Sequence, residues 1–152
     1  MAVNPNTDFS SGQTLTADNM NRLPRGIVAY NTATASDASV TVEEVQISGV
    51  TFTAVANRLY RITYYEPGFG SSVAAAMTMR IRLTNISGAI QQQGIVYNTG
   101  VQQQSGIVVG YSTYTAGSVT LVATLQNSTG TGSANRSATA FAILSVEDCG
   151  PY

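Results

Sequence analysis

Apolar and polar residues alternate with a period of two along most of the chain from about residue 27 onward. In the clearest run, "MTMRIRLTN" at 77–85, Met77, Met79 and Ile81 alternate with threonine and arginine. Successive side chains of a strand point to opposite faces, so this run predicts a strand with one core face. Similar runs predict further strands at 27–33, 39–47, 50–55, 58–65, 106–114, 118–126 and 137–146, with a weaker one within 89–97.

Eight or nine short strands without helical periodicity between them favour an all-β fold, an antiparallel β-sandwich of the jelly-roll kind. A chain of 152 residues is long enough for one domain with its own hydrophobic core. We therefore expect an N-terminal arm with a short helix at 1–26, a sandwich at 27–147 and a C-terminal tail at 148–152.

The arm contains a sequence signal for the start of a helix, and a signal for its end follows closely. Thr16 is the candidate N-cap, and Pro24 ends any helix within about two turns. A helix this short is marginal by itself. Either the arm docks on a neighbouring protein, through Met20 and Leu23 with the arginines Arg22 and Arg25, or it packs as a lid over an edge of its own sandwich.

Low charge and bulky strands predict self-association. Charged residues make up 10% of the chain, so its faces lose little ion hydration on burial. In "NRLYRITYYEP" both faces of the strand at 58–65 carry large side chains, among them Tyr64 on one and Tyr65 on the other. We expect a homo-oligomer, most simply a trimer, with Tyr64 in the contact.

Charge and residue usage exclude several functions. The net charge is −1 and the seven basic residues, all arginines, form no run, which argues against nucleic acid as a partner. No apolar stretch approaches the roughly 20 residues of a membrane span. Histidine is absent, and adjacent acids such as Glu43 and Glu44 point to opposite faces of a strand. We expect no catalytic site, no cofactor and no metal.

Arg80 and Arg82 share the polar face of the clearest strand. Their guanidinium groups repel each other unless they bind carboxylates or carbonyls. We expect them to bind Glu43, Glu44 or Glu66, within a subunit or across an interface; the alternative is that both reach into solvent.

Two similar segments, "IQQQGIVY" at 90–97 and "VQQQSGIVV" at 101–109, predict a hairpin that turns at 98–100. The segments form either a polar hairpin without a ligand or a surface for a saccharide or protein. The residues of that candidate surface are Gln91, Gln92, Gln93, Gln102, Gln103, Gln104, Tyr97 and Tyr111.

Three segments carry a resemblance to a known group of proteins: "MAVNPNTDFSSGQTLTADNMNRLPRGIV" at the front, "FTAVANRLYRITYYEP" in the middle and "LSVEDCGPY" at the end. They resemble small virion structural proteins of tailed bacteriophages, in which an arm, a β-sandwich and a closing segment follow in this order. Cys149 departs from the pattern, which more often has an aliphatic residue there. The resemblance implies a virion protein that is assembled in the host bacterial cytoplasm, with other virion proteins as partners.

Several functions stay open at this point. The first is a non-enzymatic oligomeric component of the tail, tail tip or fibre that contacts the host surface. The second is a capsid decoration protein, and the third is a carbohydrate-binding module that uses tyrosine and glutamine side chains. A hydrolase that uses carboxylates is the fourth. Immunogold labelling of particles distinguishes the first two, and a glycan array tests the third.

Overall fold

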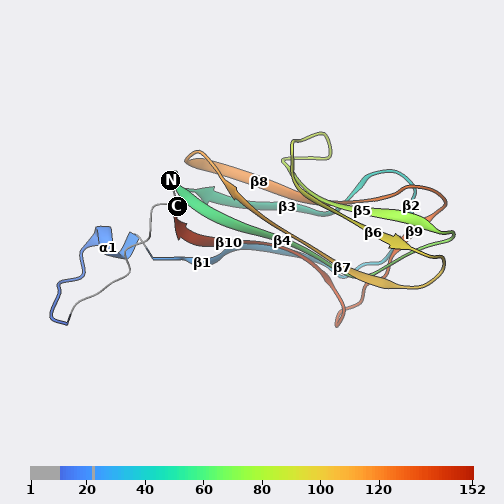
Figure 1. Cartoon of the computed structure of the whole chain (residues 1–152), viewed down its shortest axis with the longest axis horizontal. Helices are drawn as coiled ribbons and strands as arrows, with labels where there is room; N and C mark the ends of the chain where they lie inside the picture. Colours follow the sequence, from blue (N-terminus) through green and yellow to red (C-terminus); the bar gives the residue numbers. More distant parts are fainter. Residues whose placement is uncertain (1–10, 22) are drawn as a thin grey trace.

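Two β-sheets pack face to face, and a short arm extends from one end (Figure 1). The computed structural model describes residues 11–21 and 23–152. Every strand pair within them is antiparallel. The predicted jelly-roll-like β-sandwich is therefore confirmed.

The first sheet is built around its longest strand, β4. One edge of β4 pairs with β7, and the other pairs first with β10 and then with β9. β1 extends the sheet beyond β10, and β2 extends it beyond β9. The bounds are β1 (Gly26–Ala33), β2 (Asp37–Val40), β4 (Arg58–Ser71), β7 (Gln104–Thr113), β9 (Gly132–Ala134) and β10 (Ala142–Pro151).

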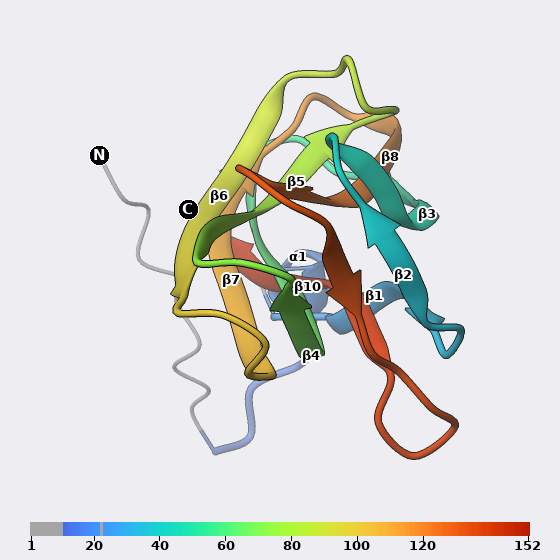
Figure 2. The same cartoon turned by 90° about the vertical axis from the view of Figure 1, so that its right-hand side faces the viewer.

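The second sheet has the order β3-β8-β5-β6 and covers the first (Figure 2). Its strands are β3 (Glu44–Ala54), β5 (Ala75–Leu83), β6 (Ile90–Asn98) and β8 (Gly117–Asn127). The predicted core face of 77–85 is correct, because Met77, Met79 and Ile81 are fully buried. They share the core with Tyr60 and Ile62 of β4.

Two predicted strands, 39–47 and 50–55, are regrouped in the structure. Residues 37–40 form β2, and β3 runs without a break from Glu44 to Ala54. Its register shifts between Val45 and Val50, and Gly49 has a φ of 64°. Ser48–Gly49 is typical of a turn in sequence, but here it forms a β-bulge, where glycine tolerates the left-handed backbone.

The expected C-terminal tail is part of the sandwich. Residues up to Pro151 belong to β10, which pairs with β1 and with β4. The prediction of a tail at 148–152 is wrong because Asp148 is buried and Gly150 and Pro151 pair with Leu59 and Arg58.

The predicted hairpin of 90–97 and 101–109 is also wrong. β6 pairs with β5 in the second sheet, whereas β7 pairs with β4 in the first. β6 and β7 instead lie next to each other across the layers (Figure 2). A Cβ on Gly94 would lie 3.0 Å from Val108 Cγ2, and one on Gly110 would lie 2.9 Å from Gln92 Cβ. The glycines thus permit a close approach between the sheets.

Candidate functional site at the base of the N-terminal arm

The buried side chain of Arg58 joins three segments that are far apart in the sequence. Its Nε donates to Oδ2 of Asp148 in β10 at 2.6 Å. Its Nη1 donates to the backbone carbonyl of Asn21, and its Nη2 donates to that of Leu23 at 2.7 Å. We call Arg58, Asp148 and these two carbonyls the arm anchor.

The anchor explains how so short a helix is held. Helix α1 (Ala17–Asn21) begins after Thr16, whose Oγ1 accepts a hydrogen bond from the Asn19 amide at 3.2 Å, as the predicted N-cap requires. At the other end the last carbonyls have no donor within the helix. The Arg58 guanidinium supplies donors there and brings a positive charge to the helix C-terminus, where cations are favourable.

Asp148 is the buried partner that holds Arg58 in place. Its Oδ1 accepts a hydrogen bond from the Gly150 amide at 2.9 Å, and its carbonyl accepts one from the Arg25 amide at 3.2 Å. The Arg25 Nε lies 4.0 Å from Oδ2, but the Arg25 side chain is half exposed. Arg58 is therefore the closest cation to the buried Asp148 carboxylate, which is left without a close partner if Arg58 is replaced.

The outer part of the arm is exposed. Figure 1 shows α1 beyond the end of the sandwich, not along one of its edges. Leu15 and Met20 are exposed, while Leu23 is partly buried. Leu23 is not part of the helix, because α1 ends at Asn21; it follows in a turn that is closed by the hydrogen bond from its amide to the Met20 carbonyl at 3.3 Å. The predicted docking residue Arg22 lies outside the described residues.

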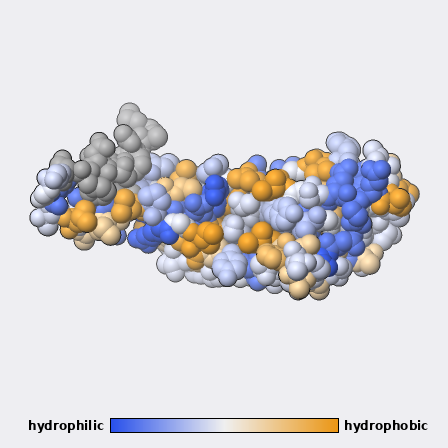
Figure 3. Space-filling model, turned by 90° about the horizontal axis from the view of Figure 1, so that it is seen from below, coloured by the Kyte–Doolittle hydropathy of each residue, from blue (hydrophilic) through white to orange (hydrophobic). Residues whose placement is uncertain are grey.

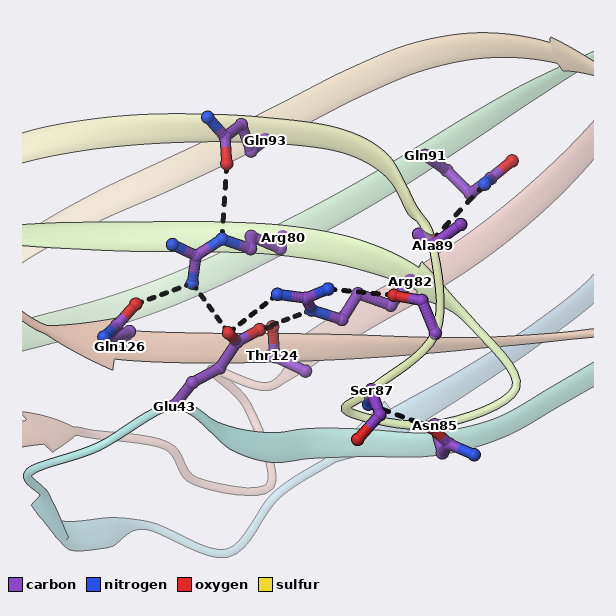
Figure 4. Close-up of polar contacts among 11 residues, drawn as sticks. Glu43, Arg80, Arg82, Asn85, Ser87, Ala89, Gln91, Gln93, Thr124 and Gln126 are labelled. Atoms are coloured by element: carbon purple, nitrogen blue, oxygen red, sulfur yellow. Dashed lines mark hydrogen bonds and ion pairs between the residues drawn. The ribbon is translucent and has the colours of Figure 1, made fainter.

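Arg80 and Arg82 bind a carboxylate, as predicted, and it is that of Glu43 (Figure 4). Arg82 donates from Nε to Oε1 at 2.6 Å and from Nη2 to Oε2 at 2.9 Å, a bidentate pair. Arg80 Nη1 lies 3.0 Å from Oε2, and Thr124 donates to Oε1 at 2.6 Å. We call these four residues the outer cluster; the two arginines and Glu43 are partly buried, and Thr124 is fully buried.

The outer cluster keeps Glu43 ionised. Burial raises the pKa of Glu43, but the hydrogen bonds from Arg82 and Thr124 and the charges of both arginines together outweigh it and lower this pKa. Glu44, the second candidate partner, behaves in the opposite way. Burial and the charge of Asp37 raise the pKa of Glu44.

Glu66, the third candidate, binds Arg136 instead. Arg136 donates to it from Nε and Nη2, each at 2.7 Å, and Tyr64 donates its hydroxyl to Glu66 Oε2 at 2.7 Å. Burial and then the Glu66 charge raise the pKa of Tyr64 well above its usual value. The prediction that Tyr64 makes a subunit contact is wrong, because its side chain is fully buried in the core.

The two buried ion pairs, Arg58 with Asp148 and Arg136 with Glu66, were not predicted from the sequence, although a pattern could have revealed them. Arg58 and Glu66 have the same parity as the core residues Tyr60, Ile62 and Tyr64. Asp148 continues the core face of Leu144 and Val146. Extending the period of two by one step in each strand places these charges inside, where they need partners.

The glutamines of the predicted ligand surface do not come together. Gln91 accepts a hydrogen bond from Ser112 at 3.3 Å, while the Gln102 carbonyl accepts one from Asn98 at 2.7 Å. Gln91 and Asn98 are separated by about 23 Å of extended strand. Gln93 binds Arg80 and Gln103 binds Asn135, whereas Gln92 and Gln104 lie elsewhere along β6 and β7.

The two tyrosines of that predicted surface are exposed on different sheets. Tyr97 pairs with Ala76 in the second sheet, and Tyr111 pairs with Arg61 in the first. Within residues 11–21 and 23–152 no group of three potential metal ligands occurs. No helix in the described part of the chain is long and apolar enough to cross a membrane.

Comparison with known proteins finds a similar fold but no matching family. No family model and no curated protein matches the sequence. The Eiger TNF of S. frugiperda is similar in structure, with a TM-score of 0.52 and 9% identity over 84% of this chain and 96% of that chain. A xylan-binding CBM22-1 domain of Paenibacillus barcinonensis has a TM-score of 0.35 at 10% identity, covering 86% and 99% of the two chains. At 9% identity the likeness to the Eiger TNF concerns the fold alone.

Proposed function

We propose that the chain is a non-enzymatic, homo-oligomeric structural protein of a tailed-bacteriophage virion, in the tail, tail tip or fibre. The observation that carries this proposal is the arm anchor. Each of the three segments that resemble phage virion proteins contributes to it: the arm through Asn21 and Leu23, the middle segment through Arg58, and the closing segment through Asp148. A shared pattern whose parts contact one another is a structural unit, which supports the resemblance.

In this proposal the arm fastens the protein to its neighbour in the particle. Arg58 fixes the base of the arm to the sandwich, while Leu15 and Met20 stay exposed beyond it. A short arm and its helix gain stability when exposed apolar side chains on them are buried against another protein. The sandwich then forms the projecting part.

Immunogold labelling of purified particles of the phage that encodes the chain tests the location. Label on the tail or its tip is the expected result. Label on the head supports the alternative of a capsid decoration protein and overturns the tail assignment. Particles that carry no label, with the protein present in the lysate, overturn the virion role itself.

Incorporation of variants tests the role of the arm. The double variant Leu15→Ser with Met20→Ser should fold normally but be missing from particles, since it removes the exposed apolar groups of the arm. Val101→Ser is the matched control, because Val101 is an even more exposed apolar residue but lies in the loop between β6 and β7. Equal incorporation of the double variant and the control would contradict the docking role.

A specific observation supports a second candidate function, binding of a saccharide. Tyr97 and Ile95 are exposed along the outer side of β6, and Gln93 and Arg80 follow on the same face. An exposed ring beside polar donors is the combination that stacks on a sugar and orients it. A glycan array with the wild type, Tyr97→Ala and the control Tyr30→Ala tests it. Binding that only Tyr97→Ala abolishes supports the site; no binding by the wild type overturns it.

A further inference from the structure

The outer face of the first sheet carries most of its large exposed side chains on its two edge strands, β1 and β7. The register of β1, β10, β4 and β7 aligns their outward residues in transverse rows. One row contains Tyr30, Ser145, Thr63 and Val109 in that order. Large side chains thus stand on the two edge strands, while the middle of the row is small and polar.

The neighbouring rows differ from this one in their middle. One has Ile27 and Tyr111 at its ends, with the charged pair Glu147 and Arg61 between them. The other has Tyr65 on the middle strand β4, beside Ile107 on the edge strand β7. Figure 3 views the molecule from below Figure 1, and orange apolar groups alternate with paler and blue ones on this side. We call this surface the rim face; its large members are Ile27, Tyr30, Tyr65, Ile107, Val109 and Tyr111.

We propose that the rim face binds a second copy of this chain and forms the subunit contact of the oligomer. The inference deepens the proposed function and rests on its statement that the protein self-associates. It names the surface that does so.

The area of the rim face is suited to a subunit contact. Its three tyrosines Tyr30, Tyr111 and Tyr65 are 67%, 61% and 37% exposed, on the order of 300 Å² at about 200 Å² for each whole side chain. The three aliphatic residues bring the apolar area to roughly 500 Å². This area is within the range of about 300–600 Å² for the largest apolar patch on a typical monomer, a patch that often has a binding function, and a stable contact buries about 800 Å² per partner. The polar centre supplies the remaining area.

The charge of the rim face favours a copy of the same chain as the occupant. The ionisable pair of the face, Arg61 and Glu147, forms an ion pair between neighbouring strands. The face is therefore neutral as a whole, so that two identical faces approach without repulsion. A partner with strong charge of either sign would have nothing to pair with there.

The test is the mass of the purified full chain in solution. Thr63→Arg places a long charged side chain at the small centre of the rim face. Thr53→Arg makes the same change on β3 of the other sheet, where Thr53 is exposed, and is the matched control. At tens of micromolar we expect wild type and Thr53→Arg at a multiple of 15.9 kDa and Thr63→Arg at the monomer mass.

A second variant keeps the test decisive if the first one misfolds. Tyr111→Ser with Ile107→Ser removes two exposed rim residues without adding charge, and circular dichroism checks that each variant retains the β-sheet spectrum. If Thr63→Arg loses this spectrum, the serine variant decides. A monomeric wild type, or an oligomer that neither folded variant dissociates, overturns the proposal. These results leave the virion role intact, since immunogold labelling tests that separately.

Discussion

The arm anchor and the outer cluster both pair arginine with a carboxylate, yet they differ in burial and in what the arginine holds. In the anchor the side chains of Arg58 and Asp148 are 4% and 1% exposed. In the outer cluster those of Arg82 and Glu43 are 15% and 16% exposed. Arg58 reaches two backbone carbonyls of a separate segment, whereas Arg82 connects strands of one sheet to the loop carbonyl of Gly88.

The difference shows how burial sets the role of the same chemical pair. A charge that is removed from water depends on its partner, so the anchor couples the position of the arm to the stability of the sandwich. The charges of a partly exposed pair are also stabilised by solvent and by neutral side chains, here Gln93 and Gln126, which accept hydrogen bonds from Arg80. The outer cluster therefore stiffens one sheet, and its loss leaves the arm in place.

Replacing Arg58 should have the largest effect. Arg58→Met should lower the free energy of unfolding by about 3–5 kcal/mol, because it leaves the buried Asp148 without its closest cation. It should also free the base of the arm, seen as faster proteolysis near residues 21–25. Arg25→Gln is the control, since Arg25 approaches the same Asp148 oxygen from an exposed position. Equal losses in urea unfolding for the two variants would contradict the role of burial.

Removing both arginines of the outer cluster should have an intermediate effect. Arg80→Gln with Arg82→Gln should cost about 2 kcal/mol in urea unfolding, because the partly buried Glu43 is left with Thr124 alone. Arg82→Gln by itself should cost more than Arg80→Gln, since only Arg82 binds Glu43 in a bidentate manner. An unfolding midpoint that the double variant does not shift would show that the cluster contributes nothing to stability.

The outer cluster should also make stability depend on pH. The pKa of Glu43 is lower in the folded protein than in the unfolded chain, where it is about 4.3. The unfolded state therefore binds more protons in acid, and the Glu43 contribution is complete above this value and disappears as the pH falls through the folded pKa. Wild type should be more stable than Glu43→Gln at pH 7, and the difference should shrink below pH 4. A constant difference would contradict the ion pair.

The exposed pair on the rim face should give the smallest effect. The side chains of Arg61 and Glu147 are 47% and 32% exposed, and an exposed pair contributes under about 1 kcal/mol. Arg61→Gln should therefore change the unfolding free energy by less than this, and less still in high salt. A loss of stability as large as that for Arg58→Met would show that the contribution of an ion pair does not follow the burial of its side chains.

The local pattern of the sequence was enough to predict the β-sandwich and most of the outer cluster. The alternation in "MTMRIRLTN" set the core face of β5 and left Arg80 and Arg82 together on the other. Two guanidinium groups on one face favour a nearby acid, and Glu43 was one of the three predicted partners. The N-cap at Thr16 and the stop at Pro24 were readable for the same reason: each depends on residues within one turn.

Only the tertiary structure decided which distant segments meet. The hydrogen bonds of Arg58 to Asp148, Asn21 and Leu23 depend on β10 lying beside β4, which no local pattern specifies. Likewise the two glutamine segments are alike in sequence, but strand pairing assigns β6 and β7 to different sheets. Alternation along a strand fixes the face that a side chain occupies, because it follows from backbone geometry. Which strand becomes its neighbour depends on contacts across the whole core, and the local sequence of either strand does not specify that pairing.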